Sequence, residues 1–337
     1  MTHLRSLRLA AALLALGAAP LAAQGHPAAG HGSQAGQHGG QHAGTAAAQP
    51  PAAPAQRPAL PPRTADAVVG TVIIAHGGGP DWNAQVEAMA AGVRTGGPVA
   101  VSYLMGPGAK THGFQHAVRK LVDEGATDIA VVPLLVSSHS GHYEQIRYLV
   151  GEVDTLSETM MHHLHMGGIT RPDVKVPLRL TRAVDESPDA ARVLAERAKA
   201  IVPDAAERSR RALFLLGHGP NSAEDYASWM RNLRQVADTV RAATGFRSVL
   251  VELVRDDAPA EVRAEAVARV RELIALQHEL TGKDVAVVPI LVSTGQVSKE
   301  KFPKDIEGLP VIYTGDALLP HPEMARWVEA RVREAGR

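Results

Sequence analysis

The sequence predicts an α/β fold made of two tandem three-layer domains, each with a mainly parallel four-stranded sheet flanked by helices. Two observations lead to this prediction. Three sequence blocks recur in the same order along the chain, which indicates an internal duplication. Within each half, short and continuously apolar segments alternate with amphipathic ones, a pattern typical of parallel strands covered by helices on both faces.

The recurring blocks define the elements of each half in order. Each half opens with an apolar strand, then His-Gly, a turn and a helical stretch, in residues 68–89 and again in 210–230. The second strands are expected within 99–108 and 249–259, followed by helices at 116–125 and 264–280. The third strand, DIAVVPLLVSS in 128–138, returns as DVAVVPILVST in 284–294, and the fourth strand with its helix recurs in 176–198 and 309–332. Ligands of such open sheets bind at the carboxyl ends of the strands.

Residues 1–23 have the features of a cleaved export signal, and we expect a periplasmic protein. Arg5 and Arg8 precede an apolar run that ends in small residues. This run is too short for a good membrane span, so no stable span is expected after signal removal, although an uncleaved anchor is the minority alternative. The expected division of the remainder is a linker in 24–66, a first half in 67–203 that carries the site, and a second half in 204–337 with a degenerate site.

The composition of the linker and of the whole chain narrows the possible functions. Residues 24–66 are rich in Gly, Ala, Gln and Pro and contain four histidines, so we expect disorder and either weak metal trapping or a plain linker. Lys and Arg number 35, as do Asp and Glu, which provides no basic stripe for nucleic acid. The chain has no cysteine, which excludes disulfides and thiolate metal sites.

Histidines follow two of the predicted strands of the first half. His76 ends the first strand, and His139 and His142 come directly after the third. Imidazoles at this edge can bind a metal ion or take up a proton, and we predict a metal site from His76, His139 and His142. The alternative is that His76 caps a turn and the other two are exposed to solvent.

An apolar strand with His-Gly, then P-L-x-x-x-S followed by His, in tandem halves, resembles the class II tetrapyrrole chelatases over residues 68–334. These are the sirohydrochlorin cobaltochelatases and ferrochelatases of cobalamin and sirohaem synthesis. The resemblance implies a lyase-type enzyme that inserts a divalent metal into a tetrapyrrole, with His76 and His142 as catalytic residues. Co²⁺ is the expected metal, with Fe²⁺, Ni²⁺ and Zn²⁺ as alternatives.

The chain also departs from the family pattern. Met105 stands where the family has a glutamate, and the second half has no histidine after its third strand. Glu144 is a candidate for orienting the ring of either histidine through a hydrogen bond between its carboxylate and the ring nitrogen that does not bind the metal ion. These departures keep a second hypothesis open, a non-catalytic periplasmic metal carrier or buffer on a chelatase scaffold.

A methionine- and histidine-rich cluster interrupts the family pattern between the third and fourth strands. Thioether and imidazole groups together suit a late transition metal, so the cluster is a candidate accessory metal site, with a mobile loop as the alternative. Its candidate ligands are Met161, His162, His163 and His165.

Overall fold

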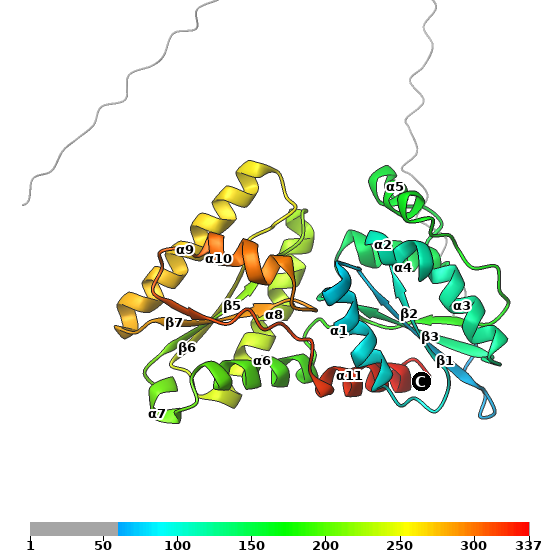
Figure 1. The fold of residues 1–337 in the computed structure, drawn as a ribbon, viewed down its shortest axis with the longest axis horizontal. Helices are drawn as coiled ribbons and strands as arrows, with labels where there is room; N and C mark the ends of the chain where they lie inside the picture. The colour runs from blue at the N-terminus through cyan, green and yellow to red at the C-terminus, as the bar shows by residue number, and fades with distance from the viewer. Residues whose placement is uncertain (1–59, 337) are drawn as a thin grey trace, which may run out of the picture. The chain divides into compact units, whose positions relative to one another are not determined.

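The computed structural model describes residues 60–336 of the chain (Figure 1). The expected export signal and most of the expected linker, including its four histidines, lie outside these residues. Within the described range, no helix combines the length and the hydrophobicity needed to cross a bilayer.

The first half builds one parallel sheet with strand order β2-β1-β3-β4. Its strands are β1 (Val69–Ala75), β2 (Val99–Tyr103), β3 (Asp128–Leu134) and β4 (Leu178–Leu180). Its helices are α1 (Pro80–Ala91), α2 (Gly106–Thr111), α3 (Phe114–Asp123), α4 (Gly141–Leu149), α5 (Glu158–Gly167) and α6 (Pro188–Ile201), after which the short α7 (Ala205–Arg208) leads into the second half.

The second half repeats this order as β6-β5-β7-β8, again with all strands parallel. Its strands are β5 (Ala212–Gly217), β6 (Ser248–Leu253), β7 (Val285–Ile290) and β8 (Val311–Tyr313). Its helices are α8 (Ala223–Thr244), α9 (Ala260–Thr281), the π-helical turn η1 (Val297–Lys301), α10 (Phe302–Asp305) and α11 (Pro322–Glu334). The predicted fold class, two tandem α/β domains with parallel four-stranded sheets, is confirmed.

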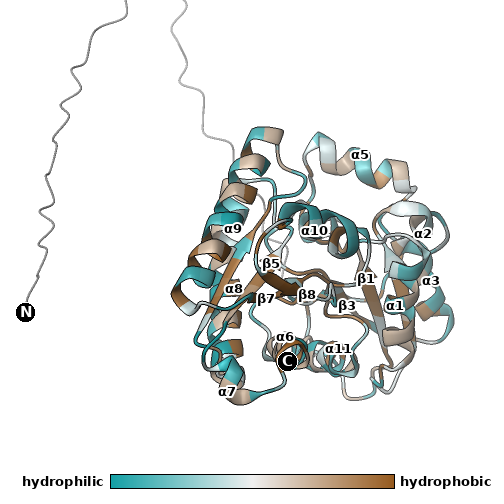
Figure 2. Ribbon diagram, turned by 60° about the vertical axis from the view of Figure 1, so that its left-hand side comes forward, coloured by the Kyte–Doolittle hydropathy of each residue, from teal (hydrophilic) through white to brown (hydrophobic). Residues whose placement is uncertain are grey.

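The central strands are almost continuously apolar because both of their faces are covered. In β1, Val72 and Ile74 contribute to one hydrophobic cluster and Ile73 to another, since successive strand residues point to opposite faces. All three side chains are fully buried. Figure 2 shows the strands as the most hydrophobic elements and the helices as mixed.

The two halves exchange their last helices. Helix α6, which ends the first half in the sequence, packs against α8 and β7 of the second half, and α11 packs against α1 and β3 of the first (Figure 1). One hydrophobic cluster therefore runs through both halves and includes Ile73, Leu215 and the fully buried Trp327. The expected boundary between residues 203 and 204 separates the two repeats in the sequence, but the exchanged helices join the two halves in one hydrophobic core.

The end of the expected linker is fixed to the first half. Arg63 pairs with the buried carboxylate of Asp128 at 3.0 Å, and Arg179 pairs with the other oxygen at 2.6 Å. Arg179 also donates to the carbonyl of Pro61. Because Asp128 is the first residue of β3, these contacts lie at the end of the sheet opposite the candidate histidines.

Candidate metal site

His76 directly follows β1, and its backbone and ring are both held in place. Its carbonyl accepts a hydrogen bond from the Met105 N–H at 2.8 Å. Its Nδ1 lies 2.7 Å from the carbonyl oxygen of Gly77, which can only accept, so Nδ1 carries the proton and Nε2 keeps its lone pair. Gly77 has φ +91°, and a Cβ there would lie 2.3 Å from the Met105 carbonyl oxygen, so this turn requires glycine.

His142 lies in the first turn of α4, where Ser140 caps the helix by accepting from the Tyr143 N–H. The His142 and His76 ring centroids are 4.7 Å apart, with an angle of 82° between the ring planes. On its other side, His142 Nδ1 lies 2.8 Å from Oε1 of Gln145. The carboxyl ends of β1 and β3 thus bring together the two histidines expected to be catalytic.

The surroundings of the His142 ring oppose its protonation. Burial, and next the neighbouring His76, lower the pKa of His142 to about 4. Burial also lowers the pKa of His218, an effect that Asp257 partly offsets. The His142 imidazole is therefore neutral at pH 7, the form that binds a metal ion or accepts a proton.

Two further histidines approach the pair. The His163 ring of α5 lies 6.4 Å from that of His142, with 28° between the planes. His163 Nδ1 is buried, and the described residues offer it no hydrogen-bond partner. His218, which follows β5, packs edge-on against Trp229 at 5.5 Å, and it is close enough to lower the pKa of His142. Both halves therefore contribute to the surroundings of the pair.

The remaining residues of the predicted site lie apart from the pair. His139 is exposed, and its backbone carbonyl accepts from the Trp229 indole N–H at 2.5 Å. Glu144 pairs with Arg147 at 3.0 Å, and the group that contacts the His142 ring from behind is the next residue, Gln145. Across residues 60–336, no group of three or more His, Asp or Glu side chains is arranged to hold a metal ion. The structure thus presents a pair of imidazoles rather than a closed three-ligand site.

The candidate accessory ligands lie on different sides of α5. His163 is directed to the pair, whereas His162 and His165 are exposed and Met161 is half-buried. Met105, the departure from the family glutamate, lies beside His76 through its backbone, and its side chain packs on the hydrophobic cluster of the first sheet.

The second half fills its equivalent position with an ion-pair network. The N–H of Asp256 bonds to the His218 carbonyl at 2.9 Å, as that of Met105 does to His76. The Asp256 carboxylate then pairs with Lys301 at 2.6 Å and with Arg263 at 3.2 Å. In the repeat, Ser298 takes the place of His142, and Lys301 takes the place of Gln145. The Lys301 ammonium group thus forms an ion pair with Asp256, the carboxylate that the second half has at this position.

The low pKa of His142 predicts acid sensitivity of the fold. Between about pH 6.5 and 4 the unfolded chain binds a proton at this position that the folded chain does not, so stability falls as pH falls through this window. The full shift corresponds to roughly 3 kcal/mol. Urea unfolding at pH 7 and pH 4.5 should show a smaller acid loss for His142→Gln than for the wild type. Equal losses in the two proteins would contradict the low pKa.

Comparisons with known proteins give one family match and solved structures of similar fold. Residues 70–201, which contain both histidines of the pair, match the model of the CbiX family. The solved structure of SirB from Bacillus subtilis with Fe³⁺ is 18% identical, with a TM-score of 0.53, and the match covers 80% of this chain and 95% of that chain. The sirohydrochlorin chelatase SirB from Bacillus subtilis subspecies spizizenii in complex with cobalt gives 17% and 0.52, with the same coverage.

Identities this low establish the shared fold and nothing finer. The comparison with curated proteins gives no match. The described chain has the tandem α/β fold of these chelatases, and its first half, over residues 70–201, matches the CbiX family.

Proposed function

We propose that the chain inserts a divalent metal ion into a sirohydrochlorin-type tetrapyrrole, with Co²⁺ as the first candidate and Fe²⁺ as the second. The observation that carries this proposal is the His76–His142 pair, with its rings 4.7 Å apart at the carboxyl ends of adjacent parallel strands. This spacing allows two imidazoles to share one ion bound at about 2.1 Å from each nitrogen. The CbiX match over both residues, and relatives that hold Fe³⁺ or cobalt, support it.

The chemistry of insertion requires groups of this kind. Two pyrrole N–H protons leave the macrocycle as the metal ion enters, so a base must lie near the ring. A neutral imidazole can first hold the incoming ion and then accept a proton once the ion has moved to the pyrrole nitrogens. Because the pKa of His142 is lowered to about 4, its ring is neutral at pH 7 and no bound proton competes with the metal ion, while its low basicity favours passing the proton on.

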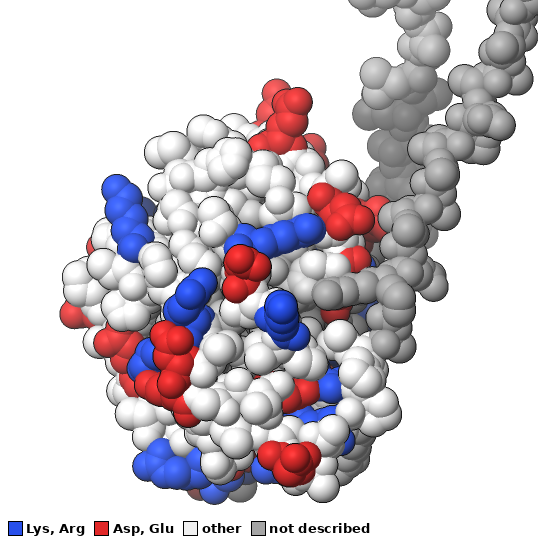
Figure 3. Space-filling model, turned by 90° about the vertical axis from the view of Figure 1, so that its right-hand side faces the viewer, with Lys and Arg blue, Asp and Glu red and all other residues white. Residues whose placement is uncertain are grey.

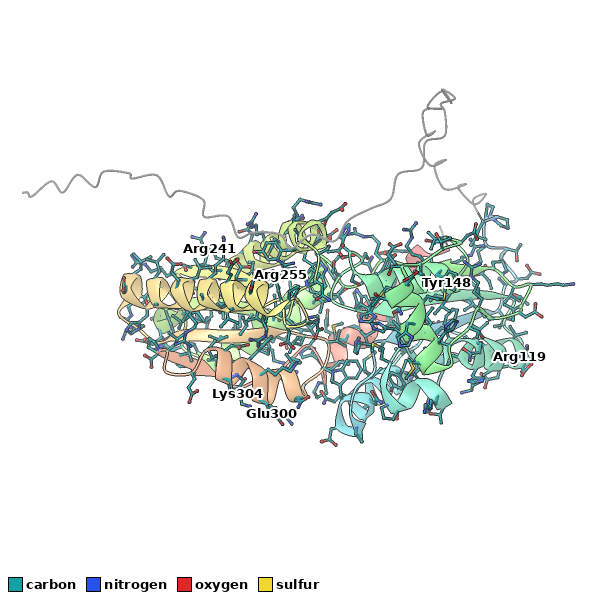
Figure 4. All side chains as sticks on the ribbon, turned by 90° about the horizontal axis from the view of Figure 1, so that it is seen from above. Arg119, Tyr148, Arg241, Arg255, Glu300 and Lys304 are labelled. Carbon is teal, nitrogen blue, oxygen red and sulfur yellow. The ribbon has the colours of Figure 1, made fainter. Side chains whose placement is uncertain are left out.

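The carboxylates of a sirohydrochlorin-type substrate require cations at the rim of the site. Two basic residues in the segments that follow the third strands of the two halves are already engaged, Arg147 with Glu144 and Lys301 with Asp256. Figure 4 shows Arg119 on the outer side of the first half, far from Arg255 on the second. On the face of the first half drawn in Figure 3, acidic and basic side chains are interspersed. This outer face of the first half therefore offers no broad positive field.

The second candidate function is that of a metal carrier, and the Met105 thioether in place of the family glutamate favours it. An absorbance assay distinguishes an enzyme from a carrier. Sirohydrochlorin and Co²⁺ are mixed without oxygen, with and without a catalytic amount of protein. An enzyme accelerates the spectral change to the metallated product over many turnovers. A protein that binds Co²⁺ but leaves the rate at its uncatalysed value is a carrier or buffer.

We propose in addition that the chain acts in the periplasm and that its histidine-rich segment supplies metal to the pair by raising the local concentration. A truncated chain starting at Leu60 keeps Arg63 and its contact with Asp128, which a start at Ala67 would remove. It should match the full chain at saturating Co²⁺ and turn over more slowly when Co²⁺ is limiting. Equal rates of the two chains at limiting Co²⁺ would contradict metal delivery.

A further inference from the structure

The Gln145 side chain is fully buried between α4 and α5 and makes two hydrogen bonds there. Its Nε2 donates to the carbonyl oxygen of Met160 on α5 at 2.7 Å. Its Oε1 lies 2.8 Å from His142 Nδ1. The amide therefore links the Met/His-rich helix to the histidine at the end of β3.

These two bonds determine the protonation of the His142 ring. A backbone carbonyl can only accept, so the amide NH₂ must face Met160 and the amide oxygen must face His142. That oxygen also only accepts, so His142 Nδ1 must carry the proton. The lone pair of the neutral ring is then on Nε2, as it is in His76, where the Gly77 carbonyl performs the same task.

The same amide also holds α5 against the site. Next to it, Gly141 lies so close to Met160 that a Cβ at residue 141 would be 2.6 Å from the methionine sulfur. One turn further along α5, His163 places its ring over that of His142. Loss of the amide would therefore release both the orientation of His142 and the contact that positions His163.

The repeat provides an internal comparison. In the second half, the residue in the place of His142 is Ser298, and the one in the place of Gln145 is Lys301, which pairs with Asp256. The buried amide is thus found in the half that has the histidine. From this pairing and the hydrogen-bond geometry, we infer that Gln145 is a positioning residue that fixes His142 as the Nδ1–H tautomer and so directs Nε2 to the metal ion. The part of this inference that concerns the metal ion rests on the proposed function, whereas the part that concerns the His142 tautomer does not.

The test uses the full chain and two substitutions. Gln145→Met keeps the length of the side chain but replaces the amide oxygen with a thioether, which is only a weak hydrogen-bond acceptor. Gln145→Glu keeps an acceptor for Nδ1–H, as in the carboxylate–histidine–metal arrangements of other proteins. Histidine ¹⁵N NMR at neutral pH without metal should show the Nδ1–H tautomer of His142 in the wild type and in Gln145→Glu. In Gln145→Met, the Nε2–H tautomer should appear, and Co²⁺ affinity should fall by about 10–100-fold.

Gln277 offers a matched control, because it is a second buried amide, 2% exposed, whose Nε2 donates to Ser248 and to the Leu213 carbonyl. Gln277→Met should change neither the His142 tautomer nor Co²⁺ affinity. A pure Nδ1–H tautomer with wild-type Co²⁺ affinity in Gln145→Met would overturn the inference. If Gln145→Met does not fold, an Nε2–H tautomer of His142 in Gln145→Glu would overturn the inference. Failure of wild-type protein to insert metal would refute the proposed function and leave the tautomer result unaffected.

Discussion

Affinity for Co²⁺ is expected to fall by at least about 100-fold when His76 and His142 are both replaced by alanine. The two rings lie 4.7 Å apart, and no group of three or more His, Asp or Glu side chains within residues 60–336 is arranged to hold a metal ion, so binding depends on this pair. Calorimetry on chains starting at Leu60 measures this loss without the histidines of the N-terminal segment. Unchanged binding by the double variant would refute the assignment of the site.

Three single variants sharpen that measurement. His278→Ala removes another half-buried histidine whose Nδ1 also bonds to a carbonyl, that of Lys283 at 2.9 Å, and it should bind Co²⁺ like the wild type. His142→Ala should lower affinity far more than His218→Ala, because only the first half has a histidine after its third strand. Equal losses for residues 142 and 218 would mean that the second half takes a larger part in binding than we propose.

Replacing Asp128 with alanine is expected to lower the free energy of unfolding by about 3–5 kcal/mol. The carboxylate is 5% exposed and pairs with Arg63 and Arg179, whose side chains are 14% and 11% exposed. Its removal leaves two largely buried guanidinium groups without their counter-ion, which costs far more than the loss of a surface pair. Urea unfolding measures the difference.

Asp154→Ala is the matched control, since its carboxylate pairs with Arg171 at 3.7 Å but is 87% exposed. Exposed pairs of this kind contribute little, so this variant should unfold like the wild type. Asp128→Ala should keep the Co²⁺ affinity of the folded protein, because Asp128 lies at the opposite end of β3 from the histidines. Unfolding of both variants at the same urea concentration would contradict the structural role of Asp128.

The strands, and the sheet edge at which the histidines lie, could be predicted from the sequence because parallel strands buried on both faces need continuous apolar runs. The proximity of His76 and His142 followed from the same reasoning, since both residues come after strands that pair in parallel. The exchange of α6 and α11 could not be predicted. Each helix has an ordinary amphipathic pattern, and this pattern does not say which of the two sheets the helix covers.

Glu144 is the predicted partner for the ring of either histidine, whereas the residue that contacts the His142 ring in the structure is its neighbour Gln145. A glutamate is the more obvious partner for an imidazole, but Glu144 points to Arg147, and Gln145 reaches the ring. The spacing of three residues between His142 and Gln145 on one helix face was the available signal. His163 was expected only among accessory ligands, because contact between α4 and α5 depends on tertiary packing.

A crystal of the protein soaked with Co²⁺, measured at the cobalt absorption edge, tests the central claim most directly. An anomalous peak is expected about 2.1 Å from Nε2 of both His76 and His142. The peak should be absent from crystals of His142→Ala. Cobalt density confined to other histidines, such as His162 and His165 on the exposed side of α5, with none between His76 and His142, would contradict it.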